Sequence, residues 1–436
     1  MRRIPLAGVV AGLALALAAC GGGDGGTGGG GTGGQKAAAG ELTGRGPITL
    51  ATGKDRSGNM QKMVDAWNKA HPNEQARIIE LPDEPNEQRQ QMIQNATTKS
   101  DTYTILNLDV VWTAEFAANR WLAELPKDKL GLDAFLPATV TTGEYRGRLF
   151  ALPTTSDSGL LYYRKDLLEK AGIAEPPKTW DEMWAACDKV AKLPEGKGVD
   201  CYLTEVAKGE GLTVSAAEAI NSTGGAFVDA SGKPNVNTPE AKKGLEFLIN
   251  AIKDGRMPKA AVTLDGEGGR RHFQSGKLLF HRQWPYQYGL ANAEDGSSKV
   301  AGKFAVAPIP GPAGPGAANL GGHNYAISAF AKNKASALDF IKFSAAEPQQ
   351  KANALATSQA PTLTSLYSDA EMVAKYPYLP TLKAAIENAK SRPSAVKYGD
   401  VTTAIQNAVY DAITGKTTAD QALADLQAKL GELTTP

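Results

Sequence analysis

The sequence is poor in the residues from which catalytic and metal sites are usually built. Its 436 residues include 3 cysteines and 4 histidines, and the histidines form no cluster at metal-ligand spacing. The common nucleotide-binding, zinc-protease, serine-hydrolase and dithiol motifs are all missing. We therefore expect no catalytic residue, no metal and no cofactor. A carboxylate pair for glycoside hydrolysis stays open, because among 46 acidic residues some will lie close together in any fold.

The sequence also lacks an excess of either charge. The formal charge is +1, and removal of Arg2 and Arg3 with an N-terminal leader would make it −1. A near-neutral chain has no basic footprint for nucleic acid or for an anionic membrane surface, so we expect no nucleic-acid partner. Hydrophobic residues make up 42% of the chain, which is ordinary for a globular protein long enough for two or three domains.

The N-terminal segment is not expected to belong to the fold. Arg2 and Arg3 precede an apolar run at residues 6–19, which is too short to span a bilayer because a spanning helix takes roughly 20 apolar residues. The run ends in Leu-Ala-Ala-Cys, which resembles the lipobox of bacterial lipoproteins. That resemblance implies a signal peptide at residues 1–19, cleavage before Cys20 and a lipid anchor on its thiol. Residues 20–46 then form a lipidated cysteine and a glycine-rich, flexible tether.

Two cysteines remain, Cys187 and Cys201. Outside the cytoplasm an isolated pair can persist as a disulfide, which typically stabilises a fold by about 2–4 kcal/mol. They form no Cys-x-x-Cys, and no histidine lies beside them at zinc-ligand spacing. We favour a disulfide, and two free buried thiols are the alternative.

Short apolar runs alternate with helical patterns in the first part of the chain. Strand candidates at residues 47–51, 77–81 and 104–108 are separated by helical segments, an order typical of a largely parallel α/β sheet. Ligands of such sheets gather beyond the carboxyl ends of the strands. Asp55 and Asp109 both follow predicted strands, so they are candidate binding groups.

The later part of the chain repeats these signals. Thr179 and Glu182 have the spacing of a capping box, which predicts the start of a helix. Residues 277–280, 304–307 and 325–328 are predicted as strands.

A segment in the middle of the chain could connect two lobes. Residues 149–152 are predicted to form a buried strand that ends at Pro153, since proline has no N–H to donate to a ladder. Small polar residues at 154–158 follow, and then a second predicted strand at 160–163. The polar residues either form an ordinary surface loop or cross between two lobes, with Asp157 facing the cleft.

Aromatic and planar polar groups also follow predicted strand ends. A sugar offers hydroxyl groups, which suit carboxylates and guanidinium groups, and C–H faces, which suit the flat faces of Trp and Tyr. Trp284 and Tyr286 could supply such a platform. The alternative is that they are core residues, since buried aromatics are commoner than ligand platforms.

These segments together resemble the extracellular sugar-binding proteins of ABC importers, the class of maltose- and trehalose/maltose-binding proteins. The resemblance extends from Ile48 to the C-terminus and is most specific in Leu-Asp-Val-Val-Trp at residues 108–112. It implies that Asp109 holds sugar hydroxyls. The positions that match binding residues of the family are Asp55, Arg89, Asp109, Asp157, Trp284, Tyr286, Gly322, His323 and Arg392.

One of these positions departs from the family pattern. Relatives often have Gly-Gly-Trp where this chain has Gly321, Gly322 and His323. The glycines could bring backbone N–H groups to a sugar. His323 either replaces a large stacking face with a smaller polar ring or is a structural histidine, so the identity of the sugar stays open.

The resemblance implies an α/β, two-lobed, type II periplasmic-binding fold with a hinge that the chain crosses three times. The N-terminal lobe would comprise residues 47–152 and 309–345, and the C-terminal lobe residues 157–308 and 346–436. It implies a monomer on the outer face of the membrane that captures an α-glucosidic disaccharide, trehalose ahead of maltose, and delivers it to ABC permease subunits. The alternatives are a lipid-anchored carbohydrate-active enzyme and a sugar-sensing lipoprotein.

Overall fold

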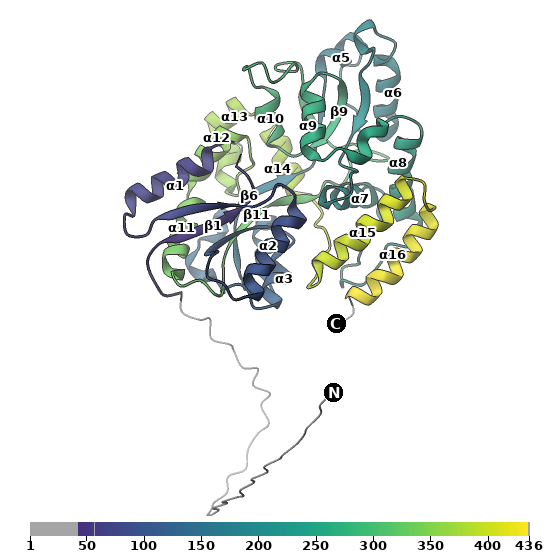
Figure 1. Cartoon of the computed structure of the whole chain (residues 1–436). Coiled ribbons are helices and arrows are strands. Elements are labelled where there is room, and N and C mark those ends of the chain that lie inside the picture. Colours follow the sequence, from purple (N-terminus) through teal and green to yellow (C-terminus); the bar gives the residue numbers. More distant parts are fainter. Residues whose placement is uncertain (1–41, 56, 435–436) are drawn as a thin grey trace, which may run out of the picture. The chain divides into compact units, whose positions relative to one another are not determined.

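The computed structural model describes residues 42–55 and 57–434, which form an α/β fold with two lobes, each built on its own sheet (Figure 1). The first sheet has the strand order β2-β1-β3-β11-β6. β1 is parallel to β2 and β3, whereas β11 is antiparallel to β3 and β6. Its strands are β1 (Ile48–Thr52), β2 (Ala76–Glu80), β3 (Ile105–Asp109), β6 (Ala151–Ser158) and β11 (Leu320–Ile327).

The second sheet has the order β10-β7-β9-β8. β8 is parallel to β9, and the other two neighbouring pairs are antiparallel. Its strands are β7 (Leu160–Tyr163), β8 (Asp200–Leu203), β9 (Leu278–Gln283) and β10 (Ala305–Pro308). A short hairpin is formed by β4 (Glu144–Tyr145) and β5 (Arg148–Leu149).

Helices cover both sheets (Figure 1). The α-helices are α1 (Asn59–Ala70), α2 (Pro85–Thr97), α3 (Thr113–Ala118), α4 (Pro137–Thr142), α5 (Lys165–Lys170), α6 (Trp180–Val190), α7 (Glu210–Ser222), α8 (Pro239–Lys253), α9 (Gly266–Gln274), α10 (Gln287–Ala291), α11 (Lys334–Ala345), α12 (Glu347–Thr357), α13 (Ala370–Lys375), α14 (Leu379–Glu387), α15 (Tyr398–Ile413) and α16 (Ala419–Thr434). Short 3-10 turns are η1 (Lys127–Lys129), η2 (Leu132–Ala134), η3 (Pro194–Gly196), η4 (Lys259–Thr263) and η5 (Thr364–Ser368).

Local signals in the sequence account for many of these boundaries. The predicted capping box is confirmed: the Thr179 hydroxyl accepts from the Glu182 backbone, and the Glu182 carboxylate accepts from the Thr179 backbone. Such reciprocal bonds satisfy N–H groups that have no partner within α6. The strand expected at 104–108 is β3, which ends at Asp109.

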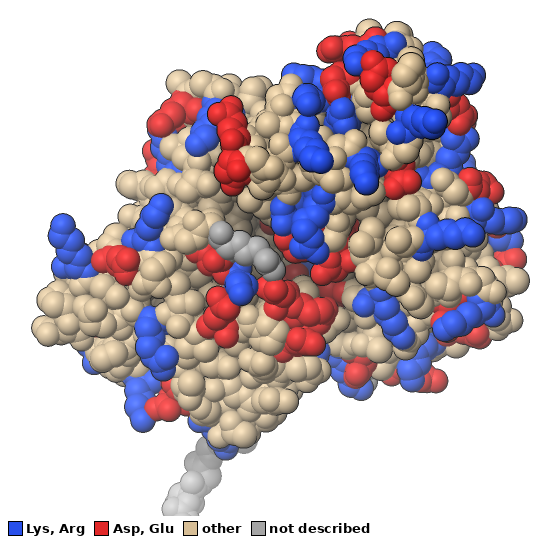
Figure 2. Space-filling model, turned by 45° about the horizontal axis from the view of Figure 1, so that its top comes forward, with Lys and Arg blue, Asp and Glu red and all other residues tan. Residues whose placement is uncertain are grey.

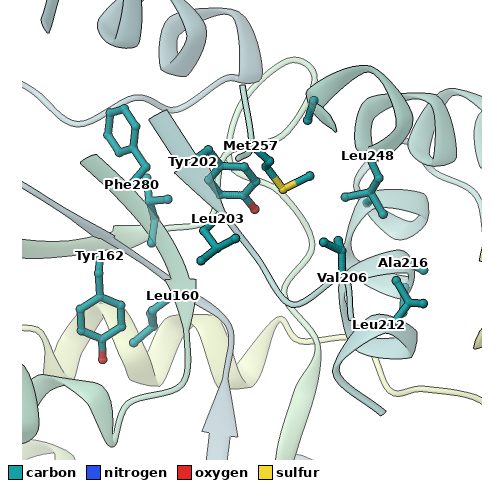
Figure 3. Packing of buried hydrophobic residues seen from close by; sticks show 14 of the residues in the cluster. Leu160, Tyr162, Tyr202, Leu203, Val206, Leu212, Ala216, Leu248, Met257 and Phe280 are labelled. Carbon is teal, nitrogen blue, oxygen red and sulfur yellow. The ribbon is translucent and has the colours of Figure 1, made fainter. Parts of the chain in front are cut away.

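Each sheet carries its own apolar core. Around the second sheet, Leu160 and Tyr162 of β7 pack in the same buried cluster as Leu203 and Phe280 (Figure 3). Two further clusters flank the first sheet, one containing Ile48 and the other containing Leu108, Trp112 and Phe116. Separate cores are the physical basis of two lobes, because each can stay packed while their connection bends.

The prediction that a strand ends at Pro153 is wrong. β6 continues from Ala151 through Pro153 to Ser158, so the polar segment is itself part of the first sheet. β6 is the edge strand in the sheet order, where a missing N–H need not break a ladder bond. The ladder with β11 shifts register between His323 and Asn324, opposite Thr155 and Pro153, which takes up the extra residue.

Cys187 of α6 and Cys201 of β8 are joined by a disulfide, with their Cα atoms 5.4 Å apart. Within residues 42–55 and 57–434, no helix has the length and apolar character needed to cross a membrane. The expected signal peptide, Cys20 and the tether up to residue 41 lie outside the described residues.

Candidate ligand-binding site

Asp109 and Arg392 meet where β3 ends. The loop between α14 and α15 brings Nη2 of Arg392 to within 2.9 Å of Oδ1 of Asp109, and Nη1 donates to Glu210 at the start of α7. Arg392 is 3% exposed, and its Nε has no hydrogen-bond partner among the described residues. The guanidinium is therefore held between two carboxylates, and its Nε–H is left for a further acceptor.

β11 connects the pair of Asp109 and Arg392 to two more predicted residues, His323 and Asp157. His323 lies opposite Asp109 in the ladder with β3, and Gly321 lies opposite Asp157 in the ladder with β6. Opposite residues point to the same face of a sheet, and so do residues two positions apart along a strand. The side chains of Asp109, Asp157 and His323 therefore lie over one face.

Burial sets the charge of these groups. The pKa of Asp157 is raised to about 8, mainly because the carboxyl is buried; Arg282 opposes this shift and Asp109 adds to it. None of the described residues donates a hydrogen bond to the Asp157 carboxyl. Burial lowers the pKa of His323, against the attraction of Asp109, so that its ring is mainly neutral at neutral pH. A carboxyl without a donor and a neutral imidazole are both suited to hydrogen bonds from hydroxyl groups.

Trp284 follows β9 and lies against the backbone of β11. A Cβ atom added to Gly321 would come within 2.7 Å of Cζ3 of Trp284, so the ring fills the space that the glycine leaves open. Arg282 lies over the same ring, with its Cζ 4.0 Å from the centroid, and forms a buried bidentate pair with Glu218. This cation–π contact orients an indole that is only partly buried.

Tyr286 and Glu205 lie on the second lobe near this ring. The hydroxyl of Tyr286 donates to Glu267 at 2.8 Å, and burial together with Glu267 raises the pKa of the phenol. Glu205 reaches between the starts of α7 and α9. A Cβ atom added to Gly211 would come within 1.9 Å of its Oε2, and one on Gly266 within 2.7 Å of its Oε1. Burial raises the pKa of Glu205, and Arg282 opposes that shift.

Arg89 differs from its expected role. Its Nε and Nη2 donate to the two carboxylate oxygens of Glu115 at 2.7 Å and 2.5 Å, and the side chain is buried. The guanidinium therefore supports a wall of the site, and the structure does not group it with Asp157 and Trp284. The carboxylate of Asp55 also has local partners, since it accepts from the backbone N–H groups of Ser57 and Met60 at the start of α1.

Gly322 has a structural reason to be glycine. Its φ is +116°, and an added Cβ atom would lie 2.3 Å from the carbonyl oxygen of Thr155. Only glycine allows β11 and β6 to pair this closely at the site.

Three residues of the site were missed in the sequence. Glu205 follows β8, Glu210 is the first residue of α7, and Arg282 lies in β9 just before Trp284. The rule that selected Asp55 and Asp109, polar groups after a strand, would have found the two glutamates. β8 itself had not been predicted, so the rule was not applied there.

Among the named groups of the site, the carboxyl groups of Asp109, Asp157, Glu205 and Glu210 outnumber the guanidinium groups of Arg282 and Arg392. Figure 2 shows a hollow in the middle of the face that it draws, with Asp and Glu side chains below it and Lys and Arg side chains above it. Acidic groups in excess favour a ligand that donates many hydrogen bonds over an anionic one. No group of three His, Cys, Asp or Glu side chains with metal-binding geometry is found in the described parts of the chain.

Two lobes with a polar, aromatic-lined site between them define the class of solute-binding proteins with a periplasmic-binding fold. Residues 51–351 match the family model of bacterial extracellular solute-binding proteins. A probable ABC transporter-binding protein of Deinococcus radiodurans is 35% identical over 384 residues, which cover 86% of this chain and 90% of that protein. The chain therefore belongs to the bacterial extracellular solute-binding protein family. Members of this family bind a solute for transport and are not enzymes.

Solved structures agree with this assignment. The maltose-bound T. maritima MalE3 is similar with a TM-score of 0.84 and 34% identity, and the match covers 89% of this chain and 99% of that one. The expected two-lobed fold is thereby confirmed.

A further relative by sequence is a mannitol-binding protein of Pseudomonas aeruginosa. It is 26% identical over 404 residues, which cover 87% of this chain and 91% of that protein.

Proposed function

We propose that this chain is the sugar-binding component of an ABC importer. The observation that carries the proposal is the grouping of Asp109, Asp157 and His323 over one sheet face, with the partly exposed ring of Trp284 beside them. Carboxyl oxygens accept hydrogen bonds from sugar hydroxyls whether or not the group is protonated, and an indole packs against the C–H face of a pyranose. The maltose in the similar T. maritima structure supports the same ligand class.

The ligand we propose is an α-glucosidic disaccharide, trehalose ahead of maltose on the segment around Asp109. Asp109 and Arg392 would bind it from one side and Asp157, Trp284 and Tyr286 from the other. A ligand that contacts both lobes stabilises the closed form, which then docks on the membrane permease; no bond of the sugar is made or broken.

The anchoring and the lobe boundaries belong to the same proposal. Lipidation of Cys20 would hold a monomer at the outer face of the membrane through the tether at residues 20–46. The lobes would comprise residues 47–152 with 309–345 and residues 157–308 with 346–436. Separate sheets and cores support a division into two lobes, but residues 157 and 158 belong to β6 of the first sheet, and Leu363, Leu366 and Tyr398 pack in the cores of the first lobe.

A thermal-shift screen of the purified protein against trehalose, maltose and mannitol tests the ligand class. A ligand that binds only the folded state raises the melting temperature, by an amount that grows with its concentration. We expect a rise with trehalose or maltose and recovery of the sugar uncleaved. A response to mannitol alone would replace the disaccharide by a polyol, and cleavage of the sugar would contradict a binding protein.

The platform is tested by Trp284→Ala, with Trp284→Phe as the matched control. Loss of the stacking face should lower the affinity for the sugar at least tenfold, which corresponds to about 1.4 kcal/mol of binding free energy. Phe keeps a flat apolar face and should retain most of the affinity. Calorimetric titration measures both, and an unchanged affinity in the alanine variant would show that Trp284 is a core residue.

A further inference from the structure

A buried contact between the two lobes lies beside α2. It is formed by Tyr398 and Gly399 with the residues that they touch, and we call it the seam. Tyr398, the first residue of α15, is fully buried, and its ring belongs to the apolar cluster of the first lobe that contains Leu108 and Phe116. The rest of α15, including Val401 and Ile405, packs in the core of the second lobe. Tyr398 is thus a side chain of one lobe inserted into the other.

Next to Tyr398 the backbone of Gly399 lies directly against the guanidinium group of Arg89. A Cβ atom added to Gly399 would lie 2.2 Å from Nη2 of Arg89, the guanidinium that is held by Glu115. A residue with a side chain at this position would collide with the Arg89 guanidinium of α2, so glycine permits the approach. An Oε1 atom of Glu84 is buried without a hydrogen-bond partner among the described residues and faces Gly209 of the second lobe, whose added Cβ would lie 3.6 Å away.

A chain of polar and charged side chains connects the seam to Asp109 of the site. The hydroxyl of Tyr398 and that of Thr402 donate to Glu210, which also accepts from Arg392. Arg392 in turn reaches Asp109 of the first lobe. The exposed fractions of Tyr398, Glu210 and Arg392 are 0%, 5% and 3%, so this side of the site offers no opening. The predicted ligand groups Asp157, Trp284 and Tyr286 do not belong to this buried group and are partly exposed.

We propose that Tyr398 and Gly399 close one end of the saccharide site and thereby determine specificity without touching the sugar. One terminal ring of the ligand then stops at Arg392, and a substituent on that end has no room, whereas the other end leads to the open side. This inference rests on the proposed function, because it assumes that a saccharide occupies the site.

The test compares maltose with two derivatives, one extended at the reducing end (4-nitrophenyl α-maltoside) and one substituted on the non-reducing ring (4′,6′-O-benzylidene maltose). Titration calorimetry should show that one derivative binds about as well as maltose and that the other binds at least 100-fold more weakly. Equal binding of both derivatives would overturn the proposal, because neither end would be closed. Exclusion of both would overturn it too, because the site would be closed at both ends.

Tyr398→Ala should lower the affinity for maltose and reduce the discrimination between the two derivatives at least tenfold. Gly399→Ala should act in the same direction, because its methyl group collides with Arg89. Tyr410→Ala is the matched control, since it removes a partly buried tyrosine from the same helix outside the seam and should leave the discrimination unchanged. Unchanged discrimination in the first two variants would contradict the role of Tyr398 and Gly399.

A measurement without sugar separates this inference from the proposed function. Small-angle scattering of the ligand-free Tyr398→Ala and Gly399→Ala variants should give a larger radius of gyration than the wild type and Tyr410→Ala. If no tested sugar binds but this difference appears, the seam stands and the ligand class is wrong. If the radius does not change, the seam does not join the lobes in solution and the inference fails.

Discussion

At the scale of single residues, the site depends on carboxyl groups whose charge is controlled by burial. Asp157 lies in an edge strand between Arg282 and Asp109, yet its pKa is raised to about 8 because desolvation outweighs the nearby arginine. In the unfolded chain an aspartate titrates near ~3.9. Between about pH 4 and pH 8 the folded chain therefore holds a proton that the unfolded chain has released.

The ligand-free protein should consequently lose stability as the pH rises across this window. Asp157→Asn stays neutral at every pH, so its melting temperature should fall less between pH 5 and pH 8 than that of the wild type. Asp400→Asn changes an exposed carboxylate and should keep the wild-type profile. Calorimetric melting at a series of pH values measures the three curves; parallel curves for wild type and Asp157→Asn would contradict a raised pKa.

At the scale of elements, the site depends on the close pairing of β6 and β11. This ladder carries Asp157 on one strand and His323 on the other, and the bulge beside His323 is part of it. The glycine at 322 combines a φ of +116° with a backbone contact that leaves no space for a side chain.

Gly322→Ala should therefore destabilise the fold by several kcal/mol, since the strands must separate in addition to the backbone strain of about 1–3 kcal/mol. Gly147→Ala is the matched control. It also has a positive φ, +74°, but its added Cβ meets nothing within 4 Å, so only the strain of about 1 kcal/mol remains. Denaturant unfolding of both variants gives the comparison, and equal losses would show that the contact with Thr155 relaxes freely.

At the scale of the whole molecule, two cores and a hinge allow the lobes to respond separately. The disulfide between Cys187 and Cys201 joins α6 to β8 and lies wholly within the second lobe. Its constraint on the unfolded chain should stabilise that lobe and leave the first lobe unaffected.

The double variant Cys187→Ser, Cys201→Ser should lower the free energy of unfolding of the second lobe by about 2–4 kcal/mol. Differential scanning calorimetry should show an earlier transition for that lobe, while the transition of the first lobe keeps its temperature. An equal shift of the two transition temperatures would show instead that both lobes unfold as one unit.

The sequence by itself predicted many of the elements and several residues of the candidate site. Local signals such as the capping box at Thr179 and the apolar runs of β3 and β7 act within a few residues, so they are readable without the fold. The resemblance to sugar-binding proteins led to Asp109, Asp157 and Trp284. Asp109 and Asp157 lie on the two strands that flank β11, and Trp284 follows β9 of the second sheet and packs against Gly321 of β11.

Only the tertiary structure decided which partners these residues have. Arg89 and Arg392 look alike in the sequence, but one is bound to Glu115 and the other bridges Asp109 and Glu210, residues more than 180 positions from it in the chain. Pairing at such separations depends on how the strands and helices pack, which local propensity does not encode. The same holds for Tyr398, whose insertion into the core of the other lobe follows from the packing of the two lobes.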